Sequence, residues 1–153
     1  MPIDTFATMT ELGYARKEGI PAPDFVLTSP FGDMAIEATS ANPPHRVAVN
    51  MPTDKAGFIE YLHNYVPIKL AKALNRKLRH QPPYWSKPEL RDIPFVLAVQ
   101  DFHRAGSMRM VVSAATDFVF CVRHWPGENG IRVERLAEHR YDGLVEPSSF
   151  FTY

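Results

Sequence analysis

The alternation of apolar and polar residues predicts a short β-hairpin near the start of the chain. One apolar segment runs from Phe25 to Thr28, and a second runs from Met34 to Ala41. The residues between them include proline and glycine, which are typical of turns. Because successive side chains of a strand point to opposite faces, Glu37 lies on the face opposite Met34, Ile36 and Ala38.

Helical spacing of apolar residues predicts helices on both sides of this hairpin. The first spans Thr5 to Glu18 and is broken by the Gly19-Ile-Pro-Ala-Pro segment. A second is predicted from Asp54 to Tyr65, with Thr53 as its N-cap. Pro67 opens a third helix that runs to about His80, because proline is tolerated in a first turn.

The second half of the chain predicts one more buried strand, a helix and a late hairpin. Phe95 to Gln100 is apolar on both faces and is predicted to be a central strand. The Asn129-Gly130 pair is a strong hairpin signal. The other predicted elements are a proline-rich loop at 81–88, a helix at 107–124 and short strands at 46–50, 131–135 and 137–141. This order predicts an α/β fold, with a small mixed sheet flanked by helices, in a single domain over residues 1–153.

The composition is ordinary for a globular protein, with 45% apolar residues among 153. No uninterrupted apolar run approaches the roughly 20 residues that span a bilayer, so no membrane segment is expected. The N-terminus lacks the basic and apolar regions of a secretory signal. The single cysteine, Cys121, excludes an internal disulfide and fits a reducing compartment, so we expect a cytoplasmic location.

Charge is balanced overall but uneven along the chain. The formal net charge is zero with histidine neutral, which argues against a protein that coats nucleic acid by charge alone. The segment 69–80 nevertheless contains several basic residues and no acid, so a local basic face is expected. These basic residues are Lys69, Lys72, Arg76, Lys77 and Arg79.

The hairpin carries two acids that its geometry can bring together. Asp24 precedes the first strand and Glu37 lies within the second. Buried carboxylates held close to each other repel unless a cation or a proton lies between them. Since Mg²⁺ takes oxygen ligands and often only one or two protein carboxylates, the pair is a candidate magnesium site.

The element order, together with Pro23-Asp24 and Glu37-Ala38-Thr39, resembles the restriction-endonuclease-like, or PD-(D/E)XK, nuclease superfamily. The core of that superfamily is a helix, a hairpin that bears these acids, a helix and a further strand. The resemblance covers roughly residues 5–122. It implies hydrolysis of phosphodiester bonds in DNA or RNA, with Mg²⁺ or Mn²⁺ held by Asp24, Glu37 and the carbonyl of Ala38.

One position departs from the superfamily pattern. Thr39 stands where the superfamily has a lysine that orients or activates the attacking water, and threonine carries no positive charge. Some members place this lysine on the following helix, which makes Lys69 and Lys72 the candidates here. Lys72 and Arg76 are also candidates to contact phosphates. The alternative is that these residues form a solvated basic face.

Polar residues at the end of the strand at 95–100 form another candidate site. The resemblance assigns Gln100 the positioning of a water molecule or a phosphate. Asp101 and His103 could converge to bind substrate or metal, or act as acid and base in a different hydrolase. The alternative is a turn aspartate beside a histidine satisfied by the backbone. The segment that begins at Asp101 is also similar to one in uncharacterised bacterial proteins, a similarity that implies no activity.

The sequence leaves two hypotheses about binding partners undecided. A non-catalytic module with the nuclease fold could use the basic helix for a binding or assembly partner. The aromatic end at 146–153 could pack as a last strand, be covered in a homodimer or by another chain, or mark a truncated sequence. No HExxH motif, Gly-rich phosphate loop or Gly-x-Ser-x-Gly elbow is present, which argues against zinc proteases, nucleoside triphosphatases and typical serine hydrolases.

Overall fold

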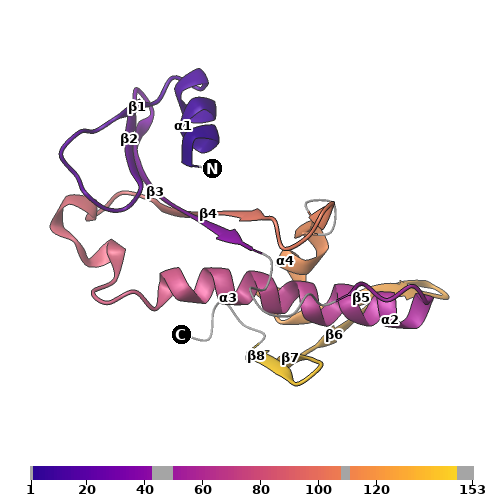
Figure 1. Cartoon of the computed structure of the whole chain (residues 1–153). Coiled ribbons are helices and arrows are strands. Elements are labelled where there is room, and N and C mark those ends of the chain that lie inside the picture. Colours follow the sequence, from indigo (N-terminus) through magenta and orange to yellow (C-terminus); the bar gives the residue numbers. More distant parts are fainter. Residues whose placement is uncertain (1, 43–49, 108–110, 148–153) are drawn as a thin grey trace. The chain divides into compact units, whose positions relative to one another are not determined.

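The computed structural model describes residues 2–42, 50–107 and 111–147, whose course is shown in Figure 1. The chain divides into two compact units. Unit 1 contains residues 1–39 and 74–99, and unit 2 contains residues 40–73 and 100–153. Within the described ranges, no helix is long and apolar enough to cross a membrane.

A four-stranded mixed sheet has the order β1-β2-β3-β4. Its strands are β1 (Ala15–Arg16), β2 (Phe25–Ser29), β3 (Gly32–Ala41) and β4 (Phe95–Asp101). The strands β2 and β3 form an antiparallel hairpin in which Phe25 is opposite Ile36. Strand β4 runs parallel to β3, since the N–H of Ala35 donates to Pro94 and that of Phe102 to Ala41. The predicted α/β class, with helices and a small mixed sheet, is therefore confirmed.

Strand β4 is not the central strand that its apolar sequence predicted. It has the last place in the order of the described strands, and Val96 is 40% exposed. Its apolar residues are explained by a core on each face of the sheet. Ala98 packs with Leu27 and Ile36 on one face, whereas Phe95 packs with Val26, Ala35 and Leu90 on the other.

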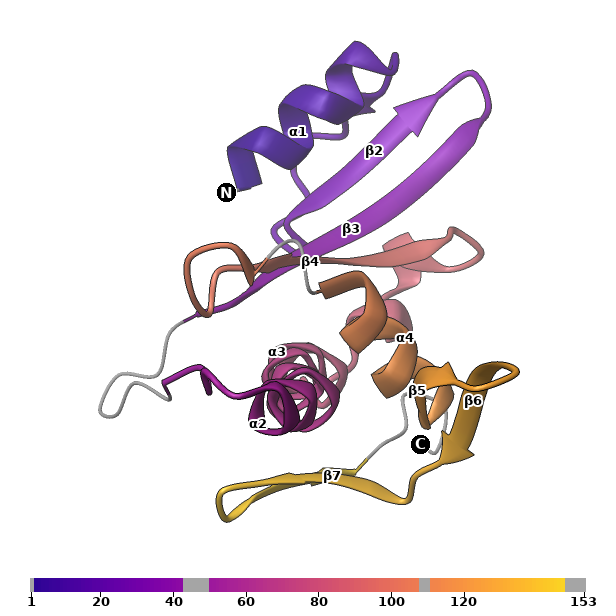
Figure 2. The same cartoon turned by 90° about the vertical axis from the view of Figure 1, so that its right-hand side faces the viewer.

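Helix α1 (Pro2–Glu11) covers one face of the hairpin in unit 1. Figure 2 shows it lying along β2 and β3, and the rings of Phe6 and Phe25 stack at 5.7 Å. The helix is shorter than the predicted span of 5–18. Gly13 follows two residues after the last helical residue, and its φ of +84° is favourable for glycine and incompatible with a continuing helix.

The two helices predicted between residues 54 and 80 are one continuous helical segment with a wider turn inside it. It consists of α2 (Lys55–Glu60), a π-helical turn (Tyr61–Tyr65) and α3 (Val66–Leu78). The wider turn directly precedes Pro67, which has no N–H to continue the α-helical hydrogen bonds. The N-cap is Asp54 rather than Thr53, because the Asp54 carboxylate accepts a hydrogen bond from Gly57 at 2.8 Å.

The remainder of unit 2 contains α4 and two hairpins. Helix α4 (Val111–Phe120) ends before the predicted residue 124, since Cys121 has a φ of +57° and a strand begins after it. The Asn129-Gly130 hairpin is confirmed: β5 (Val122–Gly127) pairs with β6 (Gly130–Arg135). The second hairpin joins β7 (Glu138–Tyr141) to β8 (Leu144–Pro147). The aromatic residues at 148–153 and the strand predicted at 46–50, apart from Asn50, lie outside the described residues.

Candidate active site

The hairpin of unit 1 brings the two predicted carboxylates together. The N–H of Asp24 donates to Glu37 Oε2 at 3.1 Å, and the N–H of Ala38 donates to Asp24 Oδ2 at 2.8 Å. Each carboxylate is thus held by the backbone of the segment that carries the other. The Glu37 side chain is only 4% exposed. The site therefore combines a buried carboxylate with a half-buried one.

Lys77 supplies the positive charge that Thr39 cannot. Its ammonium group forms an ion pair with Glu37 Oε1, and its side chain is 21% exposed. A buried carboxylate without a counter-charge would be strongly unfavourable, so the ion pair with Lys77 stabilises Glu37 in its buried position. The lysine comes from the C-terminal part of α3, on the helix that follows the hairpin.

The sequence prediction named Lys69 and Lys72 as the candidates for this lysine and missed Lys77. The positions of these residues around the helix could have indicated Lys77. At about 100° per residue, Lys77 lies about 60° from the apolar Leu74, whereas Lys72 lies about 160° from it. Lys77 therefore flanks the apolar side of α3, from which a long side chain can reach into a core.

The threonine at the superfamily's lysine position is also bound by α3. Arg76 Nη2 donates to the Thr39 hydroxyl oxygen at 3.0 Å. Glu37 and Thr39 lie on the same face of β3, and the consecutive residues Arg76 and Lys77 reach them. Arg76, which was predicted to contact phosphate, thus has a protein partner at the site.

An aromatic residue closes the site on one side. Tyr84 is buried; burial, and after it the negative charge of Glu37, raise its pKa above the ordinary value for tyrosine. Its ring stacks on His80 at 4.3 Å, and Lys87 lies 5.9 Å from the ring centroid. The phenol therefore stays protonated and neutral beside the carboxylate at neutral pH.

The oxygen donors of this site are compatible with Mg²⁺ in number and type. They are the carboxylates of Asp24 and Glu37 and the carbonyl of Ala38, and Mg²⁺ often takes only one or two protein carboxylates. Among the described residues, no group of three or more His, Cys, Asp or Glu side chains is arranged to hold a metal ion. Both Glu37 oxygens accept hydrogen bonds from protein donors, so metal binding would have to replace one of these contacts.

Three other predicted residues belong to unit 2: Lys69, Lys72 and Gln100. Lys72 lies 3.8 Å from the Glu146 carboxylate. Burial lowers the pKa of Lys69 from its ordinary value, and the charge of Lys72 lowers it further. Gln100 lies near the end of β4. Their predicted roles at the metal or the phosphate stay predictions.

Asp101 and His103 converge within unit 2, as the alternative hydrolase requires. Asp101 Oδ1 accepts hydrogen bonds from His103 Nδ1 at 2.6 Å and from the backbone N–H of His103 at 3.0 Å. His103 Nε2 lies 3.0 Å from the Tyr61 hydroxyl. All three side chains are buried, and the histidine is satisfied by side chains on both ring nitrogens.

Unit 2 contains a second aspartate–histidine cluster, which the sequence did not predict. Asp117 is buried, and its two oxygens are bound by His63 Nδ1 at 2.9 Å and His124 Nδ1 at 2.6 Å. His139 is fully buried nearby, and neither ring nitrogen has a hydrogen-bond partner in the part of the chain that the structure describes. These residues are far apart in sequence, so only the fold reveals the cluster.

Comparisons with known proteins identify no relative. No family model matches the chain, and searches of curated proteins and of solved structures found no match. The nuclease resemblance therefore depends on the sequence elements and on the geometry of Asp24, Glu37 and Lys77.

Proposed function

We propose that this protein is a Mg²⁺-dependent nuclease that hydrolyses phosphodiester bonds in DNA or RNA, with its site at Asp24, Glu37 and Lys77. The observation that supports the proposal is the contact of the Lys77 amine with Glu37, beside Asp24. An amine beside the pair of acids is what an active site of this superfamily requires. The order of helix α1, hairpin β2–β3, helix α3 and parallel strand β4 also agrees with the restriction-endonuclease-like core.

Each residue has a distinct part in the proposed reaction. Asp24, Glu37 and the Ala38 carbonyl would hold the ion, which when bound lowers the pKa of a water molecule and stabilises charge on the phosphate. Lys77 orients the attacking water and adds positive charge next to the phosphate. Arg76, exposed on α3, can exchange its bond to Thr39 for a phosphate oxygen. Neutral Tyr84 keeps bulk water from one side of Glu37.

A second candidate function is a non-catalytic binding or assembly module. The observation that favours it is that the network is complete without any ligand: both Glu37 oxygens and the Thr39 hydroxyl have protein partners. In that case Lys77 and Arg76 simply fasten α3 to β3. The alternative hydrolase at Asp101 and His103 has less support, because both side chains are buried away from any substrate.

The nuclease proposal is tested by cleavage assays on matched variants. Plasmid and short single-stranded and double-stranded DNA and RNA are incubated with Mg²⁺, Mn²⁺ or EDTA. We expect wild-type cleavage with metal, and a loss of at least about 100-fold in Asp24→Asn, Glu37→Gln and Lys77→Met. Lys55→Met is the control, because it removes an exposed lysine from the same continuous helical segment by the same substitution. It should retain activity within about 3-fold of wild type.

Two outcomes would count against the nuclease. Cleavage that persists in both Asp24→Asn and Glu37→Gln would show that the site lies elsewhere. An inactive wild-type protein that still binds nucleic acid, with salt-sensitive binding lost in Lys72→Ala/Arg76→Ala, would identify the binding module. Circular dichroism of every variant at the assay temperature separates loss of chemistry from loss of folding.

A further inference from the structure

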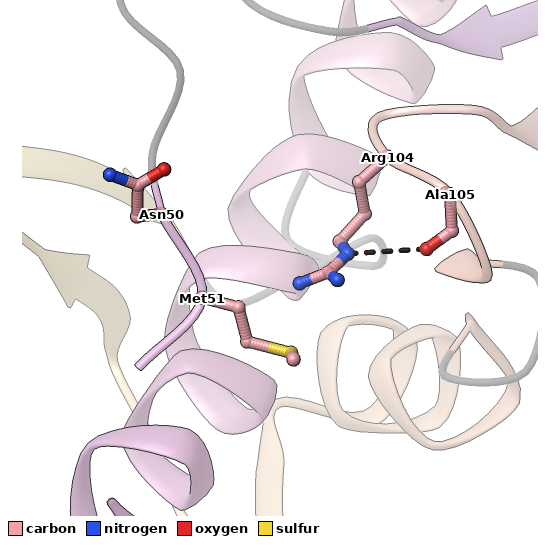
Figure 3. Close-up of a pocket in the computed structure, with 4 residues that line it drawn as sticks. All are labelled: Asn50, Met51, Arg104 and Ala105. Atoms are coloured by element: carbon pink, nitrogen blue, oxygen red, sulfur yellow. Dashed lines mark hydrogen bonds between the residues drawn. The ribbon is translucent and has the colours of Figure 1, made fainter. Parts of the chain in front are cut away.

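An open pocket lies within unit 2. It is lined by Asn50, Met51, Arg104 and Ala105. Figure 3 shows the Arg104 side chain extending between the loop that carries Ala105 and the segment that carries Asn50 and Met51. Arg104 Nε donates to the Ala105 carbonyl at 3.3 Å, which holds the side chain in this direction.

Next to Arg104, buried side chains form a series of hydrogen bonds. His103 Nδ1 lies 2.6 Å from Asp101 Oδ1, and His103 Nε2 lies 3.0 Å from the Tyr61 hydroxyl. Hydrogen bonds thus connect Asp101, His103 and Tyr61 in that order. Burial raises the pKa of Tyr61, so this hydroxyl keeps its proton.

Arg104 forms the outer end of the same series. Its guanidinium interacts with the Tyr61 hydroxyl oxygen, and a guanidinium can only donate. The contacts therefore run from Arg104 at the pocket through Tyr61 and His103 to Asp101. The partners that the structure gives Arg104 within the described ranges are a phenol and a carbonyl, not a carboxylate. Its positive charge is thus held at the pocket by neutral groups.

We propose that this pocket binds a small oxyanion, a phosphate or a carboxylate, through the guanidinium of Arg104. A guanidinium has five N–H donors, and its planar fork binds two oxygens of such a group at once. Nε is used by Ala105, which leaves the terminal nitrogens for Tyr61 and the ligand. Asn50 and Met51 complete the lining of the pocket on the facing segment. Tyr61 acts as a positioning residue, because it holds the guanidinium from behind.

The proposal is tested by calorimetric titration of the protein with inorganic phosphate and with acetate, at constant ionic strength. We expect a dissociation constant below about 10 mM for at least one anion. Arg104→Gln should weaken this binding by about 10-fold or more, and Arg104→Lys should restore part of it. Arg135→Gln, which removes an exposed arginine on β6, is the matched control and should bind like wild type.

A pair of tyrosine variants tests the positioning role. Tyr61→Phe removes the oxygen that accepts from Arg104 and should weaken phosphate binding several-fold. Tyr65→Phe is the control. Tyr65 lies in the same π-helical turn, and its ring centroid is 4.8 Å from that of Tyr61, but it is not part of the hydrogen-bonded series that leads to Arg104. Both variants lose a buried hydroxyl, so a merely structural effect would lower both affinities alike.

The source of the oxyanion is distinguished by a third titration. A 5′-phosphorylated dinucleotide that binds more tightly than its 5′-hydroxyl form, through Arg104, would identify a nucleic-acid phosphate. Equal affinity for both, with retained binding of free phosphate or acetate, would identify a small metabolite. Absence of binding by every anion, or equal binding in wild type and Arg104→Gln, would overturn the proposal.

Discussion

In unit 1 the buried carboxylate of Glu37 pairs with a lysine, whereas in unit 2 the buried carboxylates of Asp101 and Asp117 pair with histidines. The ammonium group of lysine is a compact positive charge with three N–H donors, whereas each ring nitrogen of histidine offers at most one. The two units therefore bury the same chemical group but should respond differently to mutation. Unit 2 should also respond to acid, through its buried His139.

The largest difference should follow from Lys77→Met. This variant leaves Glu37 buried without its counter-charge, and we expect a loss of about 3 kcal/mol in the free energy of unfolding. The double variant Glu37→Gln/Lys77→Met should recover part of that loss, because it removes the unpaired charge. Denaturant unfolding of wild type, both single variants and the double variant measures the coupling. A Lys77→Met protein within about 0.5 kcal/mol of wild type would show that the ion pair is not formed in solution.

A smaller loss is expected from the matching change in unit 2, Asp117→Ala. It removes the acceptor of both His63 and His124, and we expect a cost of about 2 kcal/mol in the free energy of unfolding. The cost is lower than for Lys77→Met because both rings left behind are partly exposed and can bond to water. The same unfolding experiment at pH 7.5 measures it. A loss larger than that of Lys77→Met would reverse the comparison.

The two sites also differ in how far the sequence predicts them. Asp24, directly before β2, meets Glu37 on β3 because these two strands form one hairpin, so alternation and a turn suffice to place the acids together. Lys77 reaches Glu37 across 40 positions, and His63 reaches Asp117 across 54. Such contacts depend on how helices pack on the sheet or on each other, which local patterns do not specify.

The errors in the predicted fold also arise because local sequence patterns do not specify how elements pack. Strand β4 has a sequence typical of a central strand because both faces of the sheet are covered. An apolar sequence indicates that the faces of a strand are buried, but it does not indicate whether a strand lies on each side of it. The π-helical turn at Tyr61–Tyr65 is a backbone adjustment beside Pro67, where the sequence indicates only a break between helices. Asp54 rather than Thr53 caps α2, an error of one residue that is common at helix ends.

The most gradual effect should be a loss of stability in unit 2 as the pH falls. Burial lowers the pKa of His139, and the charges of Arg123 and His63 lower it further, while the polar backbone of His63 and the charge of Asp117 oppose the shift. The folded protein therefore keeps this ring neutral at a pH where the unfolded chain, with an ordinary histidine pKa near 6.5, binds a proton. Because the unfolded state then binds more protons, stability decreases below about pH 6.5, by at most about 1.4 kcal/mol per pH unit for one such group.

Unfolding by urea at pH 7.5, 6.5 and 5.5 measures this slope, and His139→Gln should reduce it because glutamine does not titrate. The double variant Glu37→Gln/Lys77→Met is the control from unit 1, because neither charged group of that site remains, and its slope should match that of wild type. If His139→Gln kept the full slope, another group would carry the acid sensitivity. If the double variant flattened the slope instead, the pH response would belong to the lysine–carboxylate site, and the division of roles between the two units would be wrong.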